Sequence, residues 1–206
     1  MIGIATADFH GDVEKAEQVA EKAADEDADV IFVAGDVSDF NLEDPVQVVE
    51  EIVDVLKEHG QEIMAVPGNC DTPEVVRVLD TSGVSVHLKV KHIGRYDVVG
   101  MGGSNPTPFD TPLEFEENVI ESRLSELMNS AGEPVILLTH APPKNTAVDK
   151  IEAGDHVGSE AIRKIVEEFQ PELHICAHIH EAAGEDELGN TRVINPGPGG
   201  TVVIEL

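Results

Sequence analysis

The sequence contains few basic residues, with 13 lysines and arginines against 41 aspartates and glutamates, a formal net charge of −28 over 206 residues. Proteins that bind nucleic acids draw much of their affinity from Lys and Arg contacts to phosphate groups. No basic stretch interrupts the acidic sequence. The composition therefore argues against nucleic acid as a general partner.

Cysteine and long apolar runs are also scarce. The two cysteines, Cys70 and Cys176, are too far apart for a CxxC metal site or a small disulfide framework, so we expect free thiols in a reducing compartment. No apolar run is long enough to span a membrane. Residues 1–6 lack the basic region of a signal peptide, so we expect a cytoplasmic protein without a membrane partner.

The length and the 41% hydrophobic content fit one domain over residues 1–206 with a substantial core. No internal repeat or linker divides the chain. The sequence leaves the oligomeric state open, a homo-oligomer included.

Short apolar runs alternate with segments of helical periodicity. The runs at residues 2–7, 30–34, 63–66, 135–139 and 173–177 are typical of buried strands. The segments 12–24, 45–58, 116–130 and 160–169 repeat apolar residues every three or four positions, which predicts helices. Ser159 and the Asp71-Thr72-Pro73 sequence predict helix starts.

This alternation predicts an α/β fold with a largely parallel sheet in the first half. More closely spaced strands at residues 84–90, 93–100, 192–195 and 201–205 predict a mixed sheet in the second half. Two stacked sheets flanked by helices accommodate all these elements. Residues 102–112 and 141–157 are expected to form long loops, which are often functional.

Polar side chains that can bind metal follow five of the predicted strands, where sites in α/β proteins assemble. They are Asp8, His10, Asp36, Asn69, His140, His178 and His180. Taken singly, each has a structural explanation, such as a hydrogen-bonded histidine or a helix cap. Five strand ends that all supply such groups favour a metal site instead. Imidazole, carboxylate and amide ligands together suit Mn, Fe, Zn or Ni.

The same residues form ordered motifs that resemble those of the calcineurin-like metallophosphoesterase superfamily, namely D-x-H, G-D, G-N-[H/C]-[D/E], H and G-H-x-H. They stand here as Asp8-Phe9-His10, Gly35-Asp36, Gly68-Asn69-Cys70-Asp71, His140 and Ala177-His178-Ile179-His180. Ala177 replaces the usual glycine of the last motif, and Cys70 stands where many members carry histidine. With cysteine at that position, the sequence resembles the compact bacterial and archaeal phosphodiesterase branch of the superfamily.

The resemblance implies a four-layer α/β/β/α sandwich and two divalent metal ions, with manganese favoured and Ni, Fe or Zn as alternatives. It implies one metal site made by Asp8, His10 and His180 and a second made by Asn69, His140 and His178. It also implies that the carboxylate of Asp36 bridges the two ions.

The implied reaction is hydrolysis of a small phosphate ester, in particular a phosphodiester, by a hydroxide that bridges the metal ions. The residues expected to take part in catalysis are Asp36, Asn69, Cys70 and His140. A thiol is less well matched than imidazole to protonating a leaving oxygen at neutral pH, so Cys70 predicts a preference for good leaving groups. A non-catalytic metal-binding scaffold, a nuclease and a protein phosphatase remain alternatives.

Other polar residues receive weaker assignments. The long loops are expected to select the substrate, with Asn105, Lys144, Asn145 and His156 as candidate contacts, although a surface role is favoured for each. Asp71 is expected to cap the helix that follows it rather than to assist Cys70. The Asn195-Pro196-Gly197 turn is interpreted as structural.

The acid excess predicts adaptation to a high-salt cytoplasm, because a surface of like charges repels itself unless salt screens it. The thermal unfolding midpoint should therefore be higher in molar potassium chloride than in low-salt buffer, as measured by circular dichroism. An unchanged midpoint would refute the hypothesis.

Overall fold

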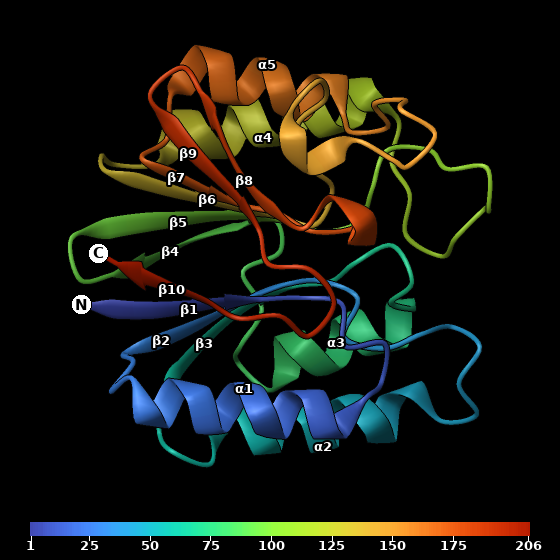
Figure 1. The fold of residues 1–206 in the computed structure, drawn as a ribbon, viewed down its shortest axis with the longest axis vertical. Helices are drawn as coiled ribbons and strands as arrows, with labels where there is room; N and C mark the ends of the chain where they lie inside the picture. Colours follow the sequence, from blue (N-terminus) through green and yellow to red (C-terminus); the bar gives the residue numbers. More distant parts are fainter.

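The computed structural model describes residues 1–206, which form two β-sheets stacked between two groups of helices (Figure 1). The smaller sheet has the strand order β10-β1-β2-β3. The parallel strands β1, β2 and β3 lie beside β10, which is antiparallel to β1. Their bounds are β1 (Ile2–Thr6), β2 (Val30–Ala34), β3 (Glu62–Val66) and β10 (Val202–Glu205).

The larger sheet has the order β4-β5-β6-β7-β9-β8. Its four central strands are parallel, and the edge strands β4 and β8 are antiparallel to their neighbours. The bounds are β4 (Lys89–Ile93), β5 (Tyr96–Met101), β6 (Val135–Thr139), β7 (Leu173–Ile175), β8 (Gly184–Leu188) and β9 (Thr191–Asn195).

Helices cover the outer face of each sheet (Figure 1). The smaller sheet packs against α1 (Val13–Asp25), α2 (Pro45–Lys57) and α3 (Pro73–Thr81). The larger sheet packs against α4 (Glu117–Ser130) and α5 (Glu160–Phe169). The predicted four-layer α/β/β/α sandwich with two mixed sheets is confirmed.

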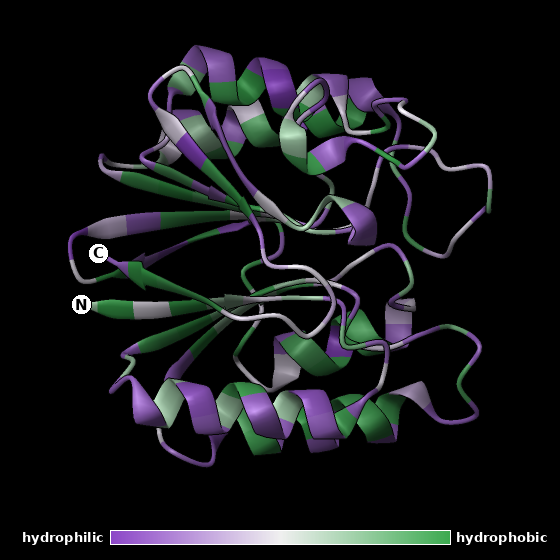
Figure 2. Ribbon diagram, viewed as in Figure 1, coloured by the Kyte–Doolittle hydropathy of each residue, from purple (hydrophilic) through white to green (hydrophobic).

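Side chains of the central strands alternate between two hydrophobic layers, as the pleat of a strand requires. In β2, Ile31 and Val33 pack against the helices, whereas Phe32 and Ala34 pack against the other sheet. The strands are therefore apolar along most of their length, and the helices are apolar on their inner faces only (Figure 2).

The predicted helix ranges differ from the observed ones by at most one residue at either end. Asp12 caps α1 by accepting a hydrogen bond from Lys15 N at 3.3 Å, and Ser159 caps α5 by accepting one from Ile162 N at 3.1 Å. The predicted helix start at Pro73 is confirmed.

Two strand predictions in the second half are wrong in detail, and one strand was not predicted. The strand predicted at 84–90 is observed further along the chain, as β4. The hairpin turn between β4 and β5 falls at Gly94, whose φ of 57° favours glycine. The last strand, β10, joins the smaller sheet beside β1 instead of the larger one. The acidic edge strand β8 was not predicted, because it is largely exposed and lacks the apolar pattern of a buried strand.

None of the helices combines the length and the apolar character needed to cross a membrane.

Candidate metal centre

The parallel strands of both sheets end on the same side of the molecule, on the right in Figure 1. The loops after β1, β2 and β3 extend there from the smaller sheet, and those after β6 and β7 from the larger one. These five loops bring together all the predicted ligands, which are Asp8, His10, Asp36, Asn69, His140, His178 and His180.

Four of these residues have a left-handed backbone conformation. The φ angles are 55° at Asp8, 50° at His10, 48° at Asp36 and 74° at His178. Residues other than glycine seldom adopt positive φ, and such strain is concentrated at functional sites. At these residues the chain turns sharply after strands β1, β2 and β7.

Backbone hydrogen bonds between the loops hold these turns in place. Asp8 N donates to Gly35 O at 2.9 Å, and His10 N donates to Asp36 O at 2.9 Å. Ala177 N donates to His140 O at 2.8 Å in the other half of the site. The protein backbone alone therefore fixes these loops relative to one another.

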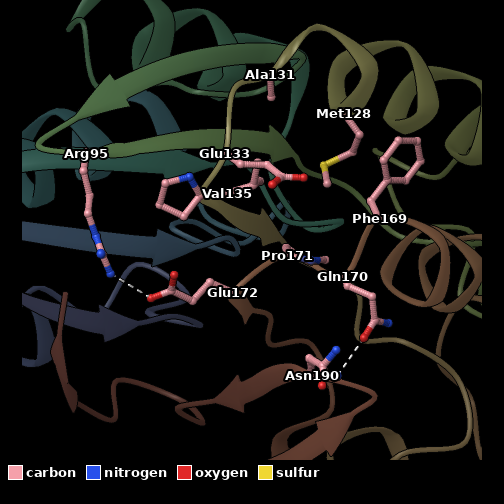
Figure 3. Close-up of a pocket in the computed structure, with 11 residues that line it drawn as sticks. Arg95, Met128, Ala131, Glu133, Val135, Phe169, Gln170, Pro171, Glu172 and Asn190 are labelled. Carbon is pink, nitrogen blue, oxygen red and sulfur yellow. Dashed lines mark hydrogen bonds and ion pairs between the residues drawn. The ribbon is translucent and has the colours of Figure 1, made fainter.

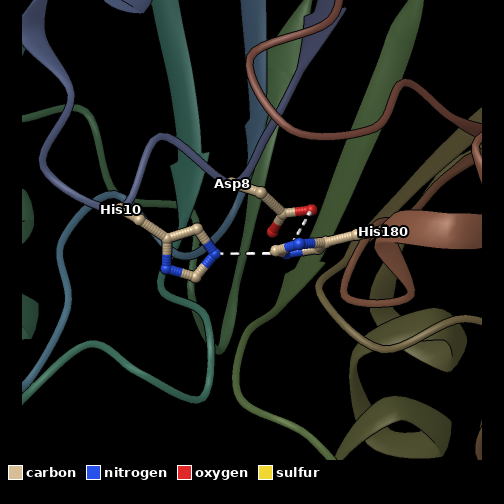
Figure 4. A group of neighbouring side chains, drawn as sticks. All are labelled: Asp8, His10 and His180. Atoms are coloured by element: carbon tan, nitrogen blue, oxygen red, sulfur yellow. Dashed lines mark hydrogen bonds and ion pairs between the residues drawn. The ribbon is translucent and has the colours of Figure 1, made fainter.

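Asp8, His10 and His180 form one group of side chains (Figure 4). The Nε2 atoms of His10 and His180 lie 3.1 Å apart, and His180 Nε2 lies 3.7 Å from Asp8 Oδ2. Their ligand atoms all fall within 4.8 Å of one another. This is the trio that the family resemblance implies for the first metal ion.

Asn69, His140 and His178 form the second group, and His140 faces Asn69 through its Nε2 atom. Its Nδ1 lies 2.7 Å from Ala34 O, and since a carbonyl can only accept, Nδ1 carries the proton. Nε2 then faces Asn69 Oδ1 at 2.8 Å and Asp36 Oδ2 at 3.5 Å. Asn69 Nδ2 donates to Thr111 Oγ1 at 3.0 Å, which orients the amide oxygen toward His140. Nε2 and these oxygens are all acceptors unless a proton or a metal ion lies between them.

The pKa shifts follow from this arrangement. Burial disfavours a charge on His140, but Asp36 and Asp8 outweigh it and raise the pKa of His140 to about 9. Burial also favours the neutral acid of Asp36, yet His140 and His10 hold the pKa of this carboxyl well below its usual range. His178, whose ring centroid lies 5.0 Å from that of His140, has its pKa lowered to about 3 by burial and by His140. It is therefore neutral, as a metal ligand must be.

Asp8 shows most directly that the site suits a cation. Its side chain is fully buried, and neither carboxylate oxygen accepts a hydrogen bond. Burial raises its pKa to about 7. An unpartnered buried carboxylate is strongly destabilised, and a divalent cation would supply the missing partner. The carboxylate, imidazole and amide donors present here fit such an ion.

Two glycines make room for these side chains. A Cβ atom at Gly68 would lie 1.9 Å from Asp36 Oδ1, and one at Gly35 would lie 2.5 Å from His140 Nδ1. Any larger residue at either position would displace Asp36 or His140. Glycine in the G-D and G-N motifs therefore has a steric cause in this structure.

Asp71 has a different role from the one predicted. Its carboxylate accepts hydrogen bonds from Gly68 N at 2.7 Å, Ser38 N at 2.8 Å and Val37 N at 3.2 Å. It makes no capping bond to α3, so the predicted cap is wrong. Burial and the nearby Asp36 raise the pKa of Asp71 to about 6. Asp71 joins the loop after β3 to the loop after β2.

Cys70 lies beside the first group, with its sulfur within 4.8 Å of the ligand atoms of His10 and Asp36. Its backbone N donates to Asp36 Oδ1 at 2.8 Å. Burial and the charge of Asp36 raise the pKa of the thiol far above its usual range. The neutral thiol therefore lies next to the carboxylate that connects the two groups.

Sequence reasoning missed several residues that position the ligands. Thr111 holds Asn69, and Thr111 N in turn donates to Glu114 at 2.9 Å. Asn195 Nδ2 donates to Ile179 O at 2.9 Å, between the predicted ligands His178 and His180. The Asn195 turn is structural as interpreted, and it also fixes the loop that carries His178 and His180. No sequence motif marks these contacts, because they join segments far apart in the chain.

The candidate substrate residues separate into two sets. Asn105 lines a groove beside His178 and His180. The other three make contacts elsewhere, since Lys144 pairs with Glu160 at 2.7 Å and both Asn145 N and His156 Nδ1 bind the Asp149 carboxylate.

A separate hollow of about 670 Å³ lies at the amino ends of β6 and β7 (Figure 3). Glu133 and Glu172 lie on its wall together with Arg95, which pairs with Glu172 at 3.2 Å. It contains none of the predicted ligands and lies at the opposite end of the larger sheet from them.

Comparison with known proteins agrees with the geometry. Residues 4–182 match the family Metallophos, described as calcineurin-like phosphoesterase. The chain is 41% identical over 175 residues to the uncharacterized protein MJ1162 of Methanocaldococcus jannaschii, covering 83% of this chain and 78% of that protein. The chain belongs to the calcineurin-like phosphoesterase family.

Solved structures share the fold. The crystal structure of TT1561 of Thermus thermophilus has a TM-score of 0.78 at 24% identity, covering 96% of this chain and 89% of that one. A dimetal phosphatase from Danio rerio has a TM-score of 0.72 at 11% identity, covering 100% of this chain and 92% of that one.

Substitution of Gly68 tests the steric argument. Gly68→Ala should displace Asp36 and weaken Mn²⁺ binding at least about tenfold, measured by isothermal titration calorimetry on protein whose fold is checked by circular dichroism. Gly132→Ala is the matched control, because its Cβ would meet only Asp97 Oδ2 at 3.4 Å. Wild-type affinity in a folded Gly68→Ala variant would contradict the argument.

Proposed function

We propose that this chain is a metal-dependent phosphodiesterase that uses two divalent ions. The observation that carries the proposal is the position of Asp36, whose carboxylate belongs both to a group with His10 and to a group with Asp8 and His140. A carboxylate shared in this way can bind two ions at once. Membership of the calcineurin-like phosphoesterase family supports the same conclusion.

Asp8, His10 and His180 would hold one ion, and Asn69, His140 and His178 the other. Two such cations would supply a hydroxide nucleophile near neutral pH and would neutralise charge on the phosphoryl oxygens. We favour manganese as the metal, a cytoplasmic location and a small phosphate ester as the substrate.

The protein side chains have distinct tasks in this reaction. Asp8 and Asp36 carry only two negative charges, so a site with two divalent ions keeps the positive charge that attracts a phosphate. His140 is held by Ala34 O, and Asn69 by Thr111, so both keep their orientation during turnover. Cys70 is the group placed to protonate the leaving oxygen, and the raised pKa of its thiol makes it a weak acid for that task.

A panel of phosphomonoesters and phosphodiesters assayed with Mn, Ni, Zn and Mg tests the proposal. We expect the highest kcat/KM for diesters with Mn, and a loss of more than about 100-fold in Asp36→Asn. Asp80→Asn is the control, since this surface carboxylate pairs with Lys89 and lies outside the site.

The other outcomes select among the alternatives. Metal binding without hydrolysis of any ester would indicate a scaffold. Release of nucleotides from single-stranded DNA would indicate a nuclease, and turnover of phosphoproteins alone a protein phosphatase.

The thiol of Cys70 predicts a dependence on the leaving group. Aryl phosphodiesters should be hydrolysed much faster than alkyl monoesters, because an aryl leaving group needs little protonation. Cys70→His should narrow this difference by raising kcat for alkyl esters, whereas Cys70→Ser should not. Equal turnover of both classes by the wild-type enzyme would count against a proton-donating thiol.

A further inference from the structure

A groove of about 600 Å³ opens beside the metal centre, between the loops 102–112 and 141–157. His178 and His180 line it, so it is continuous with the proposed metal site. Its other walls include Phe109 and Ile151, one from each loop. A phosphate bound at the centre would therefore direct one of its substituents into this space.

Hydrogen bonds hold the groove walls in place. Glu114 accepts bonds from Thr107 N at 3.0 Å and from Thr111 N at 2.9 Å, and Phe109 N donates to Thr107 Oγ1 at 3.2 Å. Asn105 Nδ2 donates to Val157 O at 3.3 Å, which joins the two loops. The groove is thus formed in advance of binding, as ligand pockets usually are.

Phe109 is the most exposed large hydrophobic residue, with 77% of its surface accessible. Its backbone is anchored, yet its ring packs against little of the protein. A ligand that covers this exposed apolar ring would remove it from water, which favours binding.

The charge of the groove limits what it can accept. No lysine or arginine lines it, and its one carboxylate, Glu181, accepts a bond from Glu152 N at 2.6 Å. An anionic substituent would meet no basic side chain there, in a protein of net charge −28. The lining favours an uncharged group.

We propose that the groove binds an uncharged apolar or aromatic substituent of the phosphate ester, with Phe109 and Ile151 as the residues that select it. The inference rests on the proposed function, because the phosphate must lie at the metal centre for its substituent to reach the groove. The expected substrates are diesters with one bulky apolar group, in preference to diesters with a second charged group.

Non-hydrolysable phosphonates separate the two parts of the site. Methyl-, phenyl-, naphthyl- and carboxyethylphosphonate are titrated into the Mn²⁺-loaded protein by isothermal titration calorimetry. Methylphosphonate reports on the metal centre alone. Naphthylphosphonate should bind at least about tenfold more tightly, since its ring is removed from water, and carboxyethylphosphonate no more tightly than methylphosphonate.

Variants of the two exposed phenylalanines assign the gain to the groove. Phe109→Ala should remove most of the naphthyl advantage and leave methylphosphonate affinity unchanged. Phe40→Ala is the matched control, because Phe40 is also exposed, at 42%, and does not line the groove. This control should leave the affinities for both phosphonates at wild-type values.

The outcomes distinguish the two proposals. Equal affinity of the wild-type protein for methyl- and naphthylphosphonate would overturn the groove inference and leave phosphodiester hydrolysis standing. A naphthyl advantage that persists in Phe109→Ala would do the same. Failure to bind any phosphonate, together with no ester hydrolysis, would overturn both.

Discussion

Three carboxylates, Asp8, Asp36 and Asp71, are buried close together at the carboxyl ends of the parallel strands of the smaller sheet. Like charges in such surroundings are costly unless each has a partner. Backbone amides satisfy Asp71, and His140 with the amide of Cys70 satisfies Asp36. Asp8 accepts nothing from the protein. The strained turns, the two crowded glycines and the converging histidines all surround this unmet requirement for positive charge.

The sequence was a good guide where local pattern determines structure. Helix caps and apolar periodicity located the helices, since they act over a few residues, and the buried strands were recognisable because both their faces are apolar. It was a poor guide at the sheet edges. β8 is acidic and largely exposed, and β10 pairs with β1 from the other end of the chain, so neither carries a local signature of its place.

The candidate site divides in the same way. The ligand positions follow from the ends of strands and from the family motifs, which are local. The residues that orient those ligands are not, because Thr111 reaches Asn69 and Asn195 reaches Ile179 only after the chain folds. Asp71 illustrates the limit, because its place before Pro73 suggested a helix cap, whereas its carboxylate joins its own loop to the loop after β2. The sequence placed Phe109 in a long loop but did not indicate that its side chain lines a groove beside the site.

The predicted ligands come from both halves of the chain. Asn69 and His140, whose side chains touch, are separated by 71 residues, and His10 and His180 by 170. Ions held between such segments would act as non-covalent cross-links between the two sheets. Because an ion that binds only the folded state shifts the folding equilibrium, resistance to denaturation and metal supply would be thermodynamically linked. Chelation would then loosen the contact between the sheets as well as remove the reactive ions.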